Sequence, residues 1–222
     1  MRGIDYFRQK IQELELKAPS EKSNFYREYT TFILNKMKTI SYIDSEGKDV
    51  EVTAFFANPE RAIAKIYEDR NLTLPVITVS IDDIDEDAER RRADHILDIN
   101  TIWDKKTQRA LRIVSKASKP LNLAFSINIW AKYVEDVNQI LETIMFMFNP
   151  SLDFKTSNNS STKSFIEQIT DNSTMSSPDK EDRIIRKMIV LTAEAYLAYP
   201  KYLVTSTGEI EKYNIDVIID EN

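Results

Sequence analysis

Two stretches of the chain carry apolar residues at the spacing of an amphipathic helix. The first follows Ser23 and Asn24, either of which suits the N-cap position. Its apolar side chains are Phe25, Tyr29, Phe32, Ile33, Met37 and Ile40. Those of the second stretch are Val137, Ile140, Leu141, Ile144, Met145 and Phe148. Because residues three or four apart share one face of a helix, each stretch predicts a helix with one buried side.

Five other stretches follow the patterns of β-strands. Residues 121–129 alternate apolar and polar side chains, which predicts a strand with one buried face. Residues 74–81 are rich in β-branched side chains, and residues 184–197 are apolar on both alternating faces, as in a strand covered on both sides. The alternation in residues 213–219 predicts a final strand, and residues 165–169 predict a short one after the polar loop at 158–162.

Turn and cap residues mark a hairpin and a third helix. The turn signal is Asp44-Ser45-Glu46-Gly47, and the apolar residues on either side of it are Tyr42, Ile43, Val50, Val52 and Phe55. Asn58-Pro59 then provides an N-cap and a first helical residue. The apolar residues of the helix that follows are Ala62, Ile63, Ile66 and Tyr67.

These elements predict an α/β fold of the α+β kind, in which a mixed or mainly antiparallel sheet is packed by two to three helices. Residues 1–20 are predicted to form a short amphipathic helix or arm, with Ile4, Phe7, Ile11 and Leu14 on its apolar side. Residues 21–222 are predicted to form one domain. Residues 82–118 interrupt the apolar pattern, so we expect a long charged loop or β-ribbon that leaves the core.

This charged excursion is the candidate contact surface of the protein. It opens with acidic residues, turns to three consecutive arginines and ends in a basic stretch. We expect the acidic half of one subunit to pair with the basic half of the next, because opposite exposed charges decide partner choice more than stability. A solvated ribbon and a nucleic-acid contact are the alternatives, and few aromatic residues are present to stack on bases. The candidate interface residues are Asp82, Asp83, Asp85, Asp87, Arg90, Arg91, Arg92, Lys105, Lys106, Arg109 and Arg112.

Composition narrows the function classes. The formal net charge is -6, so the chain has no general attraction to nucleic acid. It contains no cysteine, which excludes disulfides and thiolate metal sites and suits a reducing cytoplasm. We expect no membrane contact, because no apolar run approaches the length of a membrane span.

Candidate chemistry is sparse. The chain has three glycines, too few for a phosphate-binding loop, and His95 is its one histidine. Asp44, Glu46 and Lys48 have the carboxylate-lysine pattern of metal-dependent nucleases but lie on the predicted turn. A calcium loop counted from Asp83 lacks the required glycine and glutamate. We therefore predict no catalytic residue, no metal and no cofactor. The aromatic and methionine side chains predicted to be core are Trp130, Tyr133, Met145, Phe146, Met147 and Phe148.

The order of several short motifs resembles a known family. Lys119 to Trp130 (KPLNLAFSINIW), Tyr133 to Glu142 (YVEDVNQILE) and Phe148-Asn149-Pro150 resemble the central block of tail-completion, or tail sheath stabiliser, proteins of contractile-tailed bacteriophages. The remaining motifs are Thr53 to Pro59, Leu74 to Val79, Arg90 to Arg92, Arg183 to Ile185, and Leu191 to Tyr196. These motifs stand in the same order and with similar spacing, and they cover most of the chain beyond about residue 25.

The resemblance implies a structural virion protein without enzymatic activity. It implies a hexameric ring at the head-proximal end of the tail, which ends polymerisation of the tube, holds the last sheath ring and joins the tail to the neck. The implied partners are further copies of the chain and the proteins of the tail tube, sheath and neck or connector. The implied location is the virion, after assembly in the host cytoplasm. The alternatives are another neck or connector protein and a metal-dependent nuclease.

Overall fold

The computed structural model describes residues 24–69, 72–92, 97–104, 109–156, 161–173, 184–199, 201–204 and 210–213. The predicted helix over residues 1–20 and His95 lie outside these ranges. The chain divides into two compact units. Among the described residues, one unit contains those of 24–85 and 121–195, and the other contains those of 86–120 and 196–213. The single domain expected over residues 21–222 stays a prediction.

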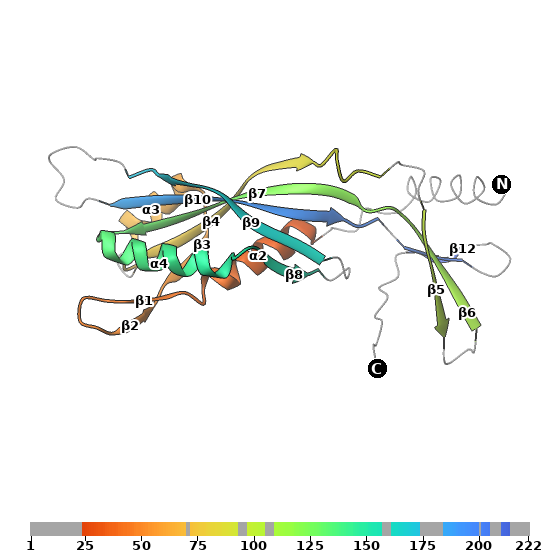
Figure 1. Ribbon diagram of the computed structural model, residues 1–222, viewed down its shortest axis with the longest axis horizontal. Coiled ribbons are helices and arrows are strands. Elements are labelled where there is room, and N and C mark those ends of the chain that lie inside the picture. Colours follow the sequence, from red (N-terminus) through yellow and green to blue (C-terminus); the bar gives the residue numbers. More distant parts are fainter. Residues whose placement is uncertain are drawn as a thin grey trace. The chain divides into compact units, whose positions relative to one another are not determined.

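The first unit contains the three helices of the described residues, labelled in Figure 1. They are α2 (Phe25–Met37), α3 (Pro59–Glu68) and α4 (Val134–Met147), and all three confirm the sequence pattern. Asn24 is the N-cap of α2. At α3, the Asn58 side chain accepts a hydrogen bond from the Arg61 N–H at 3.3 Å, and Pro59 occupies the first turn, where its missing N–H leaves no bond unmade.

The predicted hairpin is present as β1 (Ser41–Ile43) and β2 (Asp49–Glu51), which pair antiparallel. Gly47 has φ +77, a conformation that L side chains rarely adopt, and this explains a glycine at the turn. The assignment of Phe55 to this hairpin is wrong. Phe55 lies in β3 (Thr53–Phe56), which pairs in parallel with the main sheet instead.

The main sheet has six strands in the order β3-β4-β7-β10-β9-β8. The strands after β3 are β4 (Val76–Glu86), β7 (Lys119–Ala131), β8 (Leu152–Lys155), β9 (Ser161–Asp171) and β10 (Ile185–Leu197). The sheet is mostly antiparallel, with β3 and β4 as a parallel pair, so the predicted fold class is confirmed. β9 spans eleven residues and includes Ser161 and Thr162, which sequence analysis assigned to a loop.

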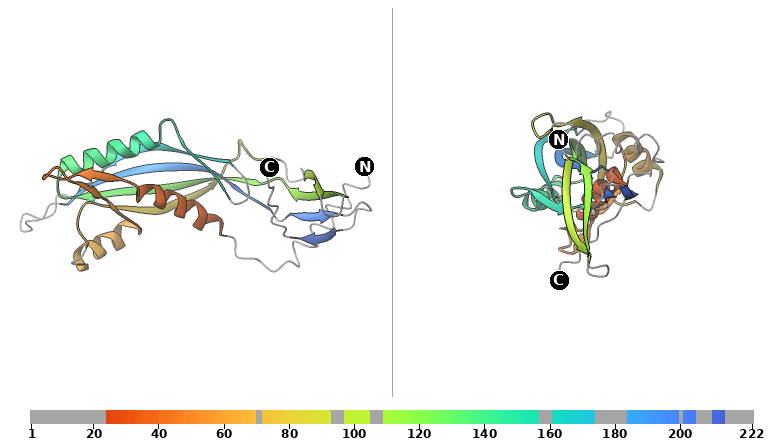
Figure 2. Two further views of the ribbon diagram at one scale, coloured as in Figure 1. Left: turned by 90° about the horizontal axis from the view of Figure 1, so that it is seen from below. Right: turned by 90° about the vertical axis from the view of Figure 1, so that its right-hand side faces the viewer.

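The core lies on both faces of this curled sheet, within the first unit. Figure 2 shows α4 beside the sheet, and Tyr29 of α2 reaches Thr162 of β9 with a hydroxyl-to-hydroxyl distance of 3.0 Å. On the opposite face, Trp130 packs with Ala62 of α3. β7 is consequently buried on both faces from Phe125 to Ala131, where alternation predicted one buried face. The Ser126 hydroxyl donates to Asp82, and Asn128 Oδ1 accepts from Arg186 Nε at 2.9 Å. Asn128 Nδ2 is buried with no hydrogen-bond partner in the described residues. A strand's period does not reveal these contacts.

The outer side of α4 departs from the sequence prediction. Val137, Ile140 and Ile144 are buried against the sheet, as expected. The prediction that the aromatic and methionine residues around α4 form core is wrong for three of its members, because these side chains point away from the buried side and are exposed. They are Tyr133, Met145 and Phe146.

The two outermost strands of the sheet are much shorter than their neighbours. β3 pairs with Val76 to Val79 of β4, and β8 pairs with Ser161 to Ser164 of β9. Within the described residues, the rest of β4 and of β9 therefore has a neighbouring strand on one side only. Glu167 is an extra residue in β9, since Ile166 and Gln168 pair with consecutive residues of β10.

The second unit contains a four-stranded sheet in the order β12-β11-β6-β5. β5 (Leu97–Asp104) and β6 (Arg109–Lys116) form an antiparallel hairpin, which confirms a β-ribbon in this part of the charged excursion. β11 (Tyr202–Val204) pairs with β6 and with β12 (Ile210–Tyr213). The predicted final strand over 213–219 falls mainly outside the described residues.

Candidate functional site

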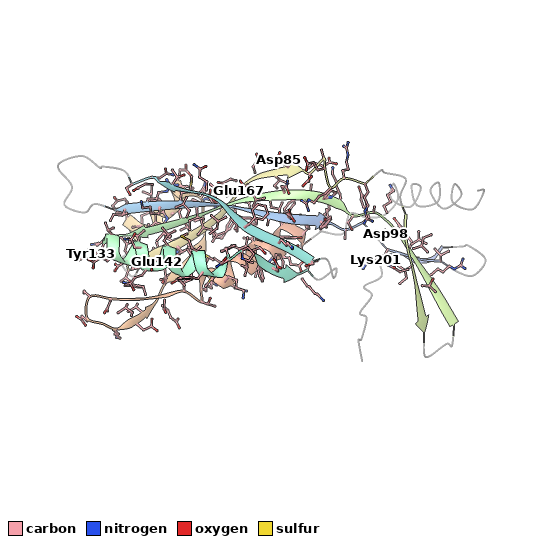
Figure 3. The ribbon with its side chains drawn as sticks, viewed as in Figure 1. Asp85, Asp98, Tyr133, Glu142, Glu167 and Lys201 are labelled. Atoms are coloured by element: carbon pink, nitrogen blue, oxygen red, sulfur yellow. The ribbon has the colours of Figure 1, made fainter. Side chains whose placement is uncertain are left out.

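The acidic start of the predicted excursion belongs to a strand. Asp82, Asp83 and Asp85 all lie in β4, which continues to Glu86 instead of ending before Asp82 as the sequence pattern suggested. The strand continues because its main chain still pairs with β7, a long-range interaction that composition does not reveal. Asp85 is labelled in Figure 3.

The Asp82 carboxylate forms hydrogen bonds within its own unit. It accepts a hydrogen bond from the Ser80 hydroxyl at 3.0 Å and another from the Ser126 hydroxyl. Asp83 accepts only the neighbouring Ile84 N–H, at 2.8 Å, and its side chain and that of Asp85 are exposed. In the described part of the chain, Asp83 and Asp85 have no cation within ion-pair distance, so these two carboxylates remain available to a partner.

Asp87 organises the turn that carries the three arginines. One of its carboxylate oxygens accepts the N–H groups of Glu89 and Arg90 at 2.9 and 3.0 Å. The other accepts Arg90 Nε at 2.7 Å. The side-chain hydrogen bond from Arg90, with the backbone bonds, lowers the pKa of Asp87 to about 2. Asp87 and Arg90 therefore form a fixed, charged turn within one chain.

The Arg90 side chain also contacts an aromatic ring. Its guanidinium lies over the Tyr196 ring at 5.1 Å from the ring centre, and its side chain is 19% exposed. A cation over an aromatic face is attracted by the ring's negative face. Arg90 thus has a structural role in this unit, which its position beside Arg91 and Arg92 in the sequence did not indicate.

Arg91 and Arg92 differ from Arg90 in exposure. Their side chains are 59% and 62% exposed. Arg91 lies 3.7 Å from a carboxylate oxygen of Glu86, and Arg92 lies 3.5 Å from one of Asp98. Exposed ion pairs of this kind contribute roughly 0–1 kcal/mol and exchange partners readily. Both guanidinium groups can therefore rearrange toward another protein at small cost.

Glu86 and Lys119 form a further pair that the candidate set omitted. Lys119 Nζ lies 2.8 Å from Glu86 Oε2. The hydrogen bond from Lys119 lowers the pKa of Glu86, and the same bond raises the pKa of Lys119. Part of the acidic and basic charge of the excursion is therefore balanced within one chain. No local signal in the sequence joins residues this far apart, because their proximity follows from the pairing of β4 with β7.

The basic end of the excursion lies on the β5–β6 hairpin. Arg112 is exposed on β6, directly opposite Thr101 of β5. Arg109 pairs with Asp104 in the strand register, but its side chain lies outside the described residues, as do Lys105 and Lys106. The structure therefore brings Asp87 together with Arg90, while Arg91 lies near Glu86 and Arg92 near Asp98. It places Arg112 on a different element, β6.

The carboxylate-lysine pattern at residues 44–48 has a structural explanation. Asp44 Oδ1 accepts the N–H groups of Glu46 and Lys48, both at 2.9 Å, and so stabilises the hairpin turn. Within the described ranges, no group of three histidine or acidic side chains could hold a metal ion. None of the described helices has the length and hydrophobicity that crossing a membrane requires.

The family model of the T4-like virus Myoviridae tail sheath stabiliser matches residues 27–222. No curated protein matches the chain. The family match covers almost the whole chain, including the charged excursion and both compact units.

Proposed function

The chain belongs to the T4-like virus Myoviridae tail sheath stabiliser family, and we propose that copies of it form a ring that caps the head-proximal end of a contractile tail. Membership makes it a tail-completion protein and a structural component of the phage tail, not an enzyme. It interacts with the tail sheath or tube. The match over residues 27–222 is the observation that carries the proposal.

A ring explains how such a protein ends a polymer. One face of the ring matches the last ring of the tail, while the other face cannot template another and offers a surface to the neck. Contacts between two different patches of identical subunits close into a ring when the rotation between neighbours closes. The family resemblance implies six copies, and the same resemblance implies assembly in the host cytoplasm.

The candidate interface residues divide into two groups in this proposal. Arg91, Arg92 and Arg112, together with Asp83 and Asp85, are exposed and form the proposed contact between subunits or with tail partners. Lys105, Lys106 and Arg109 belong to the same proposed surface by their sequence positions. Asp82, Asp87 and Arg90 support the surface from within the chain, because their side chains are engaged there.

Reversing Arg91 and Arg92 tests this proposal. We expect Arg91→Glu with Arg92→Glu to reduce ring formation and tail completion about tenfold or more, since exposed charges set partner choice. The melting temperature should change by no more than about 2 °C, because exposed pairs contribute little to stability. Ring formation is measured by native mass spectrometry, and completed tails are counted by electron microscopy after mixing with purified tails.

Arg27→Glu with Lys38→Glu is the matched control. Both residues are exposed on or beside α2, and the change in net charge is the same. The control should assemble like the unchanged protein. A monomeric protein at high concentration, combined with particles that show no ring of it at the neck, would refute the proposed ring.

A further inference from the structure

The outward side of α4 carries an exposed stripe. Glu135, Gln139, Glu142 and Phe146 are spaced four, three and four residues apart, so they share the helical face opposite Ile140 and its buried neighbours. Phe146 is 78% exposed, the largest exposed fraction among the large apolar side chains of the described residues. Glu142 is labelled on α4 in Figure 3. An aromatic side chain this exposed contributes little to the core, which makes it a candidate contact residue.

Strand β1 extends this stripe. The Ile43 N–H donates to Gln139 Oε1 at 3.0 Å, and Gln139 Nε2 donates to the Ile43 carbonyl at 3.2 Å. These two bonds fix the hairpin against α4 and leave the Ile43 side chain 57% exposed. We call the surface formed by Ile43, Asp44, Glu135, Asp136, Gln139, Glu142 and Phe146 the α4 patch.

The α4 patch has unbalanced negative charge. Within the described residues, no cation lies at ion-pair distance from its four carboxylates, Asp44, Glu135, Asp136 and Glu142. Burial, followed by the charges of Glu135 and Asp44, raises the pKa of Asp136. The helix N-terminus partly offsets Glu135 and Asp136, but this effect fades within the first turn and does not reach Glu142. The patch therefore fits a partner surface that is basic and partly apolar.

The same chain carries such a surface on the β5–β6 hairpin. Residues 105–116, the part of the hairpin from its turn to the end of β6, contain five lysine or arginine residues and no acidic residue. In the strand register Thr101 lies opposite Arg112 and Ile99 lies opposite Val114, so Ile99, Thr101 and Arg112 share one face. Ile99 is 57% exposed, and Arg112 is exposed without an ion pair in the described residues. An apolar side chain beside basic ones complements the apolar and acidic α4 patch.

We propose that the α4 patch of one copy receives the β5–β6 hairpin of a second copy. This inference rests on the proposed ring and names the surfaces that build it. The two surfaces differ, so each copy binds one neighbour through its α4 patch and the other neighbour through its β5–β6 hairpin. Head-to-tail contacts of this kind can close into a ring. Lys119 is paired with Glu86 and Arg90 with Asp87 within the chain, so Arg112, which is exposed on β6, is the hairpin cation that this contact uses.

Charge exchange between the two surfaces tests the contact. We expect Glu135→Lys with Glu142→Lys to weaken self-association of the full chain about tenfold or more. Adding Arg112→Glu to that variant should restore part of the affinity, since opposite charges then face each other again. Self-association is measured by sedimentation velocity over a range of protein concentrations. The control is Glu68→Lys with Glu167→Lys, two exposed carboxylates of α3 and β9, and it should associate normally.

Phe146→Ser tests the apolar part of the contact. The side chain is so exposed that the variant should keep its melting temperature and lose self-association. If the unchanged protein forms rings and these variants form them equally well, the inference fails and the proposed ring stands. If the unchanged protein forms no ring, the proposed function fails as well. If the variants form rings that do not complete tails, the patch binds another tail protein, which overturns contact with a second copy.

Discussion

Single side chains decide how the charged turn behaves. Asp87 accepts hydrogen bonds from the Arg90 side chain and from the backbone N–H groups of Glu89 and Arg90, which fixes the turn at residues 87–90. Arg90 is in turn held over Tyr196. Arg91 and Arg92 follow this fixed turn directly. The direction of their side chains therefore depends on Asp87 and Arg90, which are not part of the proposed contact surface. A sequence of three arginines thus contains one structural and two exposed members.

The lowered pKa of Asp87 predicts a stability change in acid. Its pKa falls from 3.8 to about 2 on folding, so the charged carboxylate stabilises the folded state above pH 3.8. This contribution is lost as the pH falls from 3.8 toward about 2. We expect Asp87→Asn to lower the melting temperature at neutral pH, and the difference from the unchanged protein to shrink over that acid range.

Thermal unfolding followed by circular dichroism at a series of pH values measures this difference. Asp83→Asn is the control, because Asp83 accepts one local backbone bond and has no ion pair in the described residues. A difference for Asp87→Asn that stays constant down to the lowest pH would contradict the proposed role of its charge.

At the scale of elements, local signals determine where helices begin. Asn58 caps α3 through its bond to the Arg61 N–H, and Pro59 follows it in the first turn. We expect Asn58→Ala to destabilise the first unit by about 1 kcal/mol, the usual cost of a lost N-cap. Urea unfolding monitored by tryptophan fluorescence measures the loss, because Trp130 packs in the same cluster as Ala62 of α3.

Asn58→Asp separates capping from other effects of this substitution. An aspartate keeps the acceptor and adds a charge that suits a helix N-terminus, so it should retain the stability of the unchanged protein. Equal destabilisation by alanine and aspartate would show that the bond to Arg61 does not matter.

The sequence predicted those elements whose formation depends on neighbouring residues in the chain. Periodicity located α2 and α4, and turn chemistry located the β1–β2 hairpin and the start of α3. It could not assign Phe55 to β3, because parallel pairing with β4 joins segments that only the tertiary fold brings together. The helical spacing places Phe146 on the face opposite Ile140, so its exposure could have been predicted from the sequence. The sequence could not show that Tyr196 supports Arg90, since that contact depends on how distant elements pack.

At the scale of the whole molecule, the distribution of charge matters more than its sum. The chain has a formal net charge of -6, yet residues 105–119 are uniformly basic and the α4 patch is acidic. In the proposed contact, two copies attract through these two surfaces even though their net charges repel. Screening reduces both effects, since the Debye length falls from about 10 Å at 0.1 M salt to about 3 Å at 1 M.

Salt should consequently separate association from folding. We expect self-association to weaken severalfold between about 0.05 and 0.5 M sodium chloride, because contacts between exposed charges are screened. The urea midpoint of the dissociated chain should hardly move, because the buried core of the first unit is apolar. Sedimentation velocity and urea unfolding at matched salt concentrations measure the two quantities. Association that strengthens with salt would indicate a contact dominated by apolar burial instead.

The short outer strands of the main sheet matter before any tail is complete. In the described residues, β4 beyond Val79 has no strand paired on its β3 side, and a strand edge of this kind can recruit other chains into amyloid-like fibres. Asp83 and Asp85 place negative charges on that edge, so two copies meeting there repel each other, and the extra residue at Glu167 disrupts the corresponding edge of β9. These charges and the bulge therefore disfavour edge-to-edge pairing between free copies of the chain.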